Sequence, residues 1–269
     1  MKTAFYPRRS INSLFYLIPI VTLLFAERAT AQTDSLINRV SIGYDVEKHP
    51  YFNGYSATVE YARKTTMGTA LAKLQKSSRF NQVGWAGQAE WYPKLGKKSY
   101  GCAALMLSDG KIFPKLSAAA HWMPILRGGV ELEFGARFIA VNAEEKAWLG
   151  IFGATKYWRN WFFNPKLYVA SGTLINGQTA TLTIRRYNKD DASYLFLNTG
   201  ISKTNQPTVY PNLLFNTFQF NARWLQAGIH QKISTHWAID LAGGFENFES
   251  SNAEVKNRWM GNTKLSFIF

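Results

Sequence analysis

Most of the chain alternates between apolar and polar residues with a period of two, the pattern of a β-strand whose two faces meet different surroundings. In residues 130–138 (VELEFGARF), alternate side chains are apolar, and the opposite face carries Glu131, Glu133 and Arg137. Residues 236–246 (HWAIDLAGGFE) alternate in the same way. An amphipathic helix would instead repeat its apolar residues at every third or fourth position. The pattern therefore predicts an all-β protein.

About 14 segments of this kind follow one another along the chain, and each has roughly 9–13 residues, the length of a tilted transmembrane strand. The predicted strands are 38–46, 54–65, 69–78, 83–92, 98–107, 114–123, 129–140, 147–157, 161–171, 177–187, 192–202, 214–231, 236–247 and 256–269. A change of phase near Leu225 predicts a β-bulge in the segment 214–231. Twelve strands is the alternative, if 98–107 and 114–123 are not separate strands.

The amino terminus has the composition of a cleaved secretory signal peptide. Lys2, Arg8 and Arg9 precede an apolar run over residues 14–25, and residues 29–31 form an Ala-Thr-Ala cleavage site. The apolar run is shorter than the roughly 20 residues that a membrane-spanning helix needs. We therefore expect residues 1–31 to be the signal peptide, 32–37 a short N-terminal segment and 38–269 the β-domain.

Two all-β architectures fit the alternation. A soluble sandwich buries its apolar face, whereas an outer-membrane barrel turns that face to lipid and lines its lumen with polar residues. Aromatic residues make up 15% of the chain and 9 residues are Trp, many near predicted strand ends, where membrane barrels carry interfacial girdles. The alternative is the aromatic core of a soluble domain. The predicted girdle comprises Trp91, Trp122, Trp158, Trp161, Trp224, Trp237 and Trp259.

The last predicted strand ends on an aromatic residue, with Leu265, Phe267 and Phe269 on one face. In a closed barrel the last strand pairs with the first, so that no edge is left in the membrane. A terminal aromatic residue with this spacing resembles the signal that outer-membrane assembly machinery recognises. We predict an antiparallel up-and-down transmembrane β-barrel in the bacterial outer membrane, with both termini at the periplasmic end.

The middle of the chain resembles the YaiO family of outer-membrane β-barrel proteins. The residues that carry this resemblance are Ser78-Arg79-Phe80, GWAGQAEWYPKLGKKSY over 84–100, GVELEFGARF over 129–138, Arg185-Arg186-Tyr187, and Gly200 to Ser202. The resemblance extends over roughly 50–210 and implies an outer-membrane barrel without an established activity. Some relatives carry helical repeats before the barrel, which hints at polysaccharide or envelope export. Here only a few residues separate Ala31 from the first predicted strand, which weakens an export-scaffold interpretation.

Charged residues on the polar faces of the strands predict a lumen lined by both signs of charge. Burying such charges is costly unless they pair, so we expect a paired network that includes Glu131, Glu133, Arg137 and Arg185. The full set of predicted lumen charges in this network is Glu131, Glu133, Arg137, Arg185, Arg223, Asp240 and Arg258.

Catalytic motifs are weak in this sequence. His121 and His236 share a strand face with Ser117 and Asp240 respectively, but the spacing does not form a recognisable nucleophile–base pair. Cys102 is the single cysteine, and no spacing of His, Cys, Asp and Glu suggests a zinc site. We predict no catalytic residues, no cofactor and no metal.

The formal net charge of +14 favours an anionic partner. An exported chain rarely meets nucleic acid, so anionic solutes, acidic glycans and lipid headgroups are the expected partners. The sequence favours a narrow channel or envelope transport component with a basic lumen. A lipid A- or phospholipid-modifying barrel enzyme, a surface adhesin or structural anchor, and a soluble periplasmic sandwich are the alternatives.

The leader generates a first prediction. The mass of the protein purified from isolated outer membranes should equal that of residues 32–269, because cleavage is expected after Ala31. Intact-mass spectrometry measures this directly. A protein that retains residues 14–25 would instead indicate an uncleaved anchor.

Overall fold

The computed structural model describes residues 37–49, 52–173, 176–188, 192–204, 221–249 and 255–269, within one compact unit over Ser35–Phe269. The predicted signal peptide and almost all of the segment 32–37 lie outside these residues. No helix in the described part of the chain is long and apolar enough to cross a membrane.

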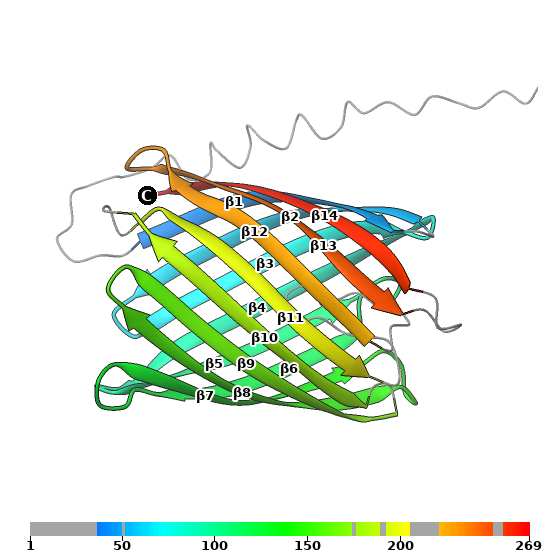
Figure 1. Cartoon of the computed structure of the whole chain (residues 1–269), viewed down its shortest axis with the longest axis horizontal. Helices are drawn as coiled ribbons and strands as arrows, with labels where there is room; N and C mark the ends of the chain where they lie inside the picture. The colour runs from blue at the N-terminus through cyan, green and yellow to red at the C-terminus, as the bar shows by residue number, and fades with distance from the viewer. Residues whose placement is uncertain (1–36, 50–51, 174–175, 189–191, 205–220, 250–254) are drawn as a thin grey trace, which may run out of the picture. The chain divides into compact units, whose positions relative to one another are not determined.

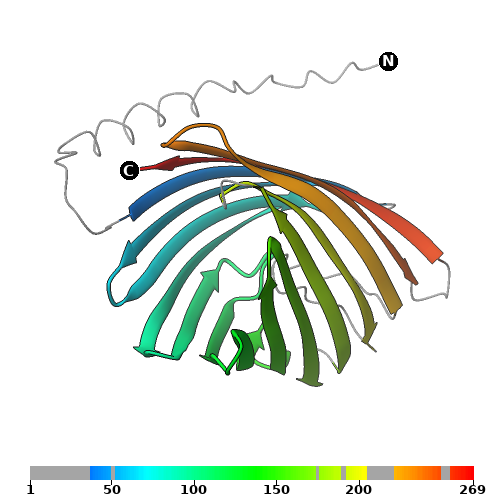
Figure 2. The same ribbon diagram turned by 60° about the vertical axis from the view of Figure 1, so that its left-hand side comes forward.

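Fourteen antiparallel strands form a closed barrel, in which each strand pairs with the next along the chain (Figures 1 and 2). This confirms the predicted fold class and the count of 14 strands. The strands are β1 (Ile37–His49), β2 (Phe52–Thr65), β3 (Gly68–Arg79), β4 (Gln82–Gly96), β5 (Ser99–Ser108), β6 (Leu116–Pro124), β7 (Val130–Ala140), β8 (Lys146–Trp158), β9 (Trp161–Gly172), β10 (Gly177–Tyr187), β11 (Tyr194–Thr204), β12 (Asn221–Lys232), β13 (Trp237–Glu249) and β14 (Val255–Ile268).

Pairing of β14 with β1 closes the barrel. Their register aligns Val40 with Phe267, and the ladder continues to the last residue. The Asn38 amide donates to the Phe269 carbonyl at 2.8 Å, and the Phe269 amide donates to the Asn38 carbonyl at 2.9 Å. In a bilayer core no water is present to satisfy backbone groups, so this ladder removes the edge that the sheet would otherwise expose.

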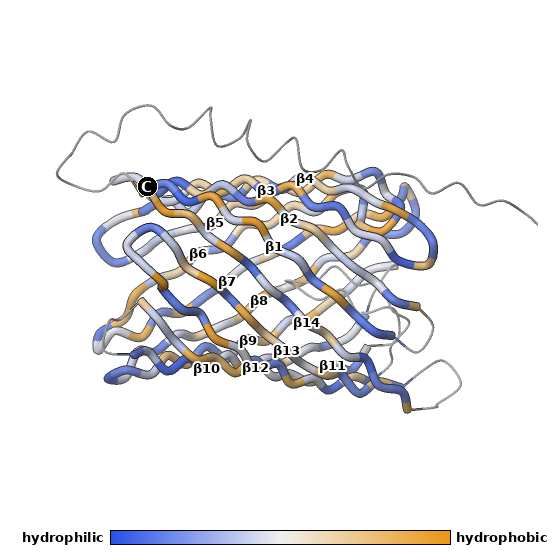
Figure 3. Tube along the Cα trace, turned by 90° about the horizontal axis from the view of Figure 1, so that it is seen from above, coloured by the Kyte–Doolittle hydropathy of each residue, from blue (hydrophilic) through white to orange (hydrophobic). Residues whose placement is uncertain are grey.

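The outer face of the barrel is apolar and the inner face is polar. On β14, Trp259, Leu265 and Phe267 are exposed on the outside, whereas Arg258 and Ser266 are buried on the inside. A similar alternation of apolar and polar residues runs along most of the other strands (Figure 3). Strand β8 is different, because Ala147, Leu149 and Ile151 place buried apolar side chains on its lumen face. A soluble sandwich would bury its apolar face, so the arrangement suits a barrel surrounded by lipid.

Tryptophan side chains on the outer face form two bands. The band near the end that holds Ile37 and Phe269, here called the terminal end, comprises Trp91, Trp122, Trp158, Trp161 and Trp237. The band near the opposite end comprises Trp85, Trp148 and Trp259. Bands at both ends match the aromatic girdles of membrane barrels, which lie at the two lipid headgroup regions.

Two predictions for residues of strand β12 are wrong. Trp224 was predicted in the girdle and Arg223 in the lumen, but Arg223 lies exposed on the outer face and Trp224 on the lumen face. The physical reason is Gly200, the register partner of Trp224: a Cβ atom at Gly200 would overlap the indole, so the ring occupies the space that glycine leaves.

The predicted bulge near Leu225 is also absent. The register of β12 with both of its neighbours is continuous over its described length, and residues 214–220 of the predicted strand lie outside the described residues. A register shift occurs instead in β4, between Lys94 and Gly96.

The outer face generates a prediction about lipid contact. Leu241 lies on the outer face of β13, between the two tryptophan bands, with 45% of its surface exposed. Leu241→Arg should destabilise the refolded barrel by about 2–4 kcal/mol, because a charge near the bilayer midplane loses its hydration. Urea titration in liposomes, followed by tryptophan fluorescence, measures this free energy.

Gln178→Arg provides the matched control, since Gln178 is exposed at the opposite-end start of β10. Its expected cost is about 0–1 kcal/mol. Equal costs for the two arginines would contradict the assignment of the outer face to lipid.

The charged lumen wall as candidate functional site

Acidic side chains on the lumen face of the described strands each bind a donor on the barrel wall. Their partners come from neighbouring or next-neighbouring strands, or in one case from the same strand. The pairs are Asp45 with Asn262, Glu47 with Arg79, Glu60 with Arg39, Glu90 with Tyr92, Glu131 with Tyr100, Glu133 with Lys166, Asp240 with Lys264, and Glu246 with Arg258.

The most deeply buried charges form the opposite-end cluster, which comprises Glu246, Arg258, Glu47 and Arg79. Arg258 Nη2 lies 2.5 Å from Glu246 Oε2, and Arg258 Nη1 lies 3.6 Å from Glu47 Oε2. The other oxygen of Glu47, Oε1, lies 2.6 Å from Arg79 Nε. The side chains of Arg258 and Glu246 are 1% and 0% exposed, so this chain of alternating charges ties β13, β14, β1 and β3 together away from water.

The β6–β9 cluster comprises His121, Glu133 and Lys166. The Glu133 carboxylate lies 2.7 Å from His121 Nδ1 through one oxygen and 2.7 Å from Lys166 Nζ through the other. The imidazole lies over Gly135, where a Cβ atom would approach its ring within 2.8 Å. Each carboxylate oxygen of the buried Glu133 therefore has a partner, one from β6 and the other from β9.

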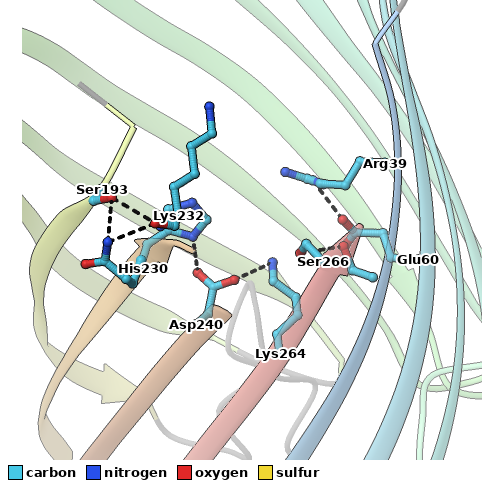
Figure 4. A network of polar contacts seen from close by, with 10 residues as sticks. Arg39, Glu60, Ser193, His230, Lys232, Asp240, Lys264 and Ser266 are labelled. Carbon is cyan, nitrogen blue, oxygen red and sulfur yellow. Dashed lines mark hydrogen bonds and ion pairs between the residues drawn. The ribbon is translucent and has the colours of Figure 1, made fainter. Parts of the chain in front are cut away.

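The β12–β14 cluster comprises His230, Asp240 and Lys264 and lies toward the terminal end (Figure 4). Asp240 Oδ1 lies 2.7 Å from His230 Nδ1, and Asp240 Oδ2 lies 3.7 Å from Lys264 Nζ. The ion pair of Arg39 with Glu60, at 2.9 Å, lies beyond Lys264 on the next strands along the wall (Figure 4). Opposite charges thus alternate along the wall from β12 to β2.

Two ion pairs cross an intervening strand at a glycine. Glu47 on β1 faces Gly54 on β2, and a Cβ atom at Gly54 would lie 2.5 Å from Glu47 Oε1. Glu133 on β7 faces Gly153 on β8, whose other register partner is Lys166 on β9. Each acid lies across the strand beside it and reaches a base two strands away, because glycine leaves the necessary space.

The basic partner is more exposed than the acidic partner in the less buried pairs. The exposed side-chain fractions are 38% for Arg39 against 15% for Glu60, and 33% for Lys264 against 15% for Asp240. For Lys166 and Glu133 they are 26% and 10%. In each of these three pairs the cationic side chain is therefore the more exposed partner.

The predicted lumen charges do not form the one paired network that the sequence suggests, because Arg223 lies on the outer face and Arg185 lies between aromatic rings. Glu133, Asp240 and Arg258 each belong to a different cluster, and Glu131 accepts a hydrogen bond from the Tyr100 hydroxyl. Arg185 lies between two aromatic rings on the lumen face, and Arg137 lies on the lumen face of β7.

Sequence reasoning missed the role of Glu47, which it assigned to a loop after a strand ending at residue 46. The signal that could have found it is Gly54, a glycine that can face an acid across the predicted first hairpin.

In the described part of the chain, neither His121 nor His230 forms a hydrogen bond with a serine, threonine or cysteine side chain. Cys102 is the register partner of His121, but the His121 ring lies over Gly135 on the other side. Among the described residues, no group of three or more His, Cys, Asp or Glu side chains could hold a metal ion.

Comparison with known proteins supports the fold. The family model of the YaiO membrane beta barrel domain matches residues 37–207. The chain is similar in structure to a bacterial polysaccharide outer membrane secretin, with a TM-score of 0.57, 8% identity, and coverage of 88% of this chain and 100% of that chain. For the outer membrane protein Omp33 of Acinetobacter baumannii the TM-score is 0.52, with 8% identity and the same coverage. No curated protein sequence matches significantly.

The glycine crossings generate a stability prediction. Gly54→Ala should displace the Glu47 carboxylate from Arg79 and lower the free energy of unfolding by about 1–3 kcal/mol, because a buried charge loses part of its pairing. Gly43→Ala is the matched control on the lumen face of β1, since a Cβ atom there meets its nearest neighbour at 3.7 Å. Urea unfolding of both variants measures the difference, and an equal effect would contradict the role of Gly54.

Proposed function

Because the chain belongs to the YaiO family of membrane β-barrels, we propose that this bacterial outer-membrane protein is a narrow channel that favours anionic solutes. The observation that carries the proposal is the unequal exposure of the lumen ion pairs. In these pairs the acid lies against the wall and the base extends toward the lumen.

Charge placement supports the direction of selectivity. A fixed positive group near the path of an ion lowers the energy of an anion and raises that of a cation, and the effect is stronger inside a low-dielectric wall. The described lumen acids are each held by a donor on the wall, which reduces the negative potential they contribute. The exposed ends of Lys166, Lys264 and Arg39 then make the largest contribution to the electrostatic potential along the path of a solute.

The same proposal assigns roles to the predicted outer features. Leu265, Phe267 and Phe269 lie on the outer face at the terminal end and form the signal for the outer-membrane assembly machinery. The outward-facing tryptophans anchor the barrel in the lipid headgroup regions. We infer that the terminal end faces the periplasm, because Thr204 and Asn221 lie at the opposite end and the sequence between them is longer than that between any other two successive strands.

The reversal potential of the refolded protein in a planar bilayer with a KCl gradient tests the proposal. The wild type should conduct and favour chloride over potassium. Lys166→Gln/Lys264→Gln should lower the chloride preference about twofold, because two positive groups are removed from the lumen.

Lys76→Gln/Arg223→Gln is the matched control, since it removes the same charge from the outer face, where Lys76 lies over the exposed Trp85. Its permeability ratio should equal that of the wild type. A barrel that folds without conducting, or one that favours potassium, would overturn the proposal.

A further inference from the structure

Aromatic side chains form a continuous row on the lumen face at the terminal end, across the consecutive strands β8 to β12. Tyr157 lies 5.1 Å from Phe162 and 6.4 Å from Tyr187, measured between ring centroids. Tyr187 lies 5.2 Å from Tyr194, and Tyr194 stacks on His230 at 4.9 Å. Neighbouring ring planes in this row are inclined by 64°, 36° and 57°, and Phe162 is only 8% exposed. A solute at the terminal end would therefore meet the tyrosine rings and hydroxyls of the row, with Phe162 packed beneath Arg185.

Arg185 lies within this row and is held by it. Its guanidinium carbon lies 4.7 Å from the Phe162 ring centroid and 5.0 Å from the Tyr194 ring centroid. In the part of the chain that the structure describes, Arg185 forms no ion pair with a carboxylate. This differs from Arg39, Arg79 and Arg258, each of which is paired with an acid on the wall.

The guanidinium of Arg185 is planar and carries five N–H donors in a fixed fork. That planar arrangement matches the two oxygens of a carboxylate, and less of its conformational entropy is lost on binding. The tyrosine hydroxyls beside it can donate to or accept from hydroxyl groups. Such a combination of aromatic surface with a few converging polar groups is typical of a ligand site.

Sugar rings fit this combination better than small inorganic anions. A pyranose ring presents a face of C–H groups that packs on an aromatic ring, and its hydroxyl groups form hydrogen bonds at the edge. A row of platforms suits several sugar units in sequence, and Arg185 suits a carboxylate on one of them. A small anion would use the charge of Arg185 but not the row.

We propose that the mouth site, defined as Arg185 with Tyr157, Phe162, Tyr187 and Tyr194, binds acidic oligosaccharides whose carboxylate pairs with Arg185. The inference deepens the proposed function and rests on it for the passage of these solutes through the barrel. Binding itself can be measured without conduction.

Binding of tetragalacturonate, maltotetraose and citrate to the refolded protein in detergent tests the mouth site, with isothermal titration calorimetry as the readout. The expected order is tetragalacturonate tightest, because it alone supplies both sugar rings and carboxylates. Arg185→Gln should weaken tetragalacturonate binding about tenfold and leave maltotetraose unchanged. Tyr194→Leu should weaken both sugars and leave citrate unchanged, since it removes a platform.

Two controls separate position from charge. Arg223→Gln removes an arginine from the outer face of β12 and should bind tetragalacturonate as the wild type does. Arg185→Lys keeps the charge but loses the planar fork, so it should recover only part of the affinity. If a variant fails to fold, the relative affinities of the wild type for the three probes still test whether the protein prefers an acidic oligosaccharide.

The outcomes for the mouth site and for the channel are distinguishable. Conduction with chloride preference, but with tetragalacturonate bound no better than citrate or independently of Arg185, would overturn the mouth site and leave the channel. A silent barrel that binds tetragalacturonate through Arg185 would overturn the channel and support the mouth site. In a conducting barrel, tetragalacturonate should also block the current more strongly than maltotetraose.

Discussion

The hydrogen-bond ladder between β1 and β14 is the contact on which the rest of the structure depends. A strand edge in the bilayer core would leave backbone N–H and C=O groups without water or a partner, at a cost of several kcal/mol for each group. Closure by Asn38 and Phe269 at one end of the ladder satisfies these groups and creates an inside and an outside. Every later distinction, between lipid-facing tryptophan and lumen-facing charge, follows from that closure.

Charge inside the barrel is accommodated by direct pairing along the wall. Removing one partner of a buried pair leaves an uncompensated charge, so each acid needs a donor within reach. Glycine extends this reach, because Glu47 and Glu133 each lie across a glycine on the adjacent strand to meet a base two strands away. In three of these pairs the lysine or arginine side chain is more exposed than its acid. The cationic lumen surface that we propose rests on this difference.

Aromatic residues have two separate roles that depend on the face they occupy. On the outside, Trp122, Trp158 and Trp259 are exposed in bands near the two ends of the barrel, where we propose that they meet the lipid headgroups. On the inside, Tyr187 and Tyr194 line the terminal end, and Arg185 lies between the rings of Phe162 and Tyr194. We therefore propose that the aromatic residues both anchor the barrel in lipid and supply the ligand surface at its mouth.

The alternation of residues by itself determined the all-β class, because strand periodicity is a local property. The sequence also predicted about 14 strands, with twelve as the alternative, and a last strand that closes the barrel at Phe269. The tertiary structure decided which side chains meet. Arg223 and Trp224 exchanged their predicted faces because Gly200, on the neighbouring strand, leaves room for the indole. Glu47 was missed because its base, Arg79, becomes a neighbour only through strand register across Gly54. Register and pairing are non-local, so the lumen clusters could not be read from spacing along the chain.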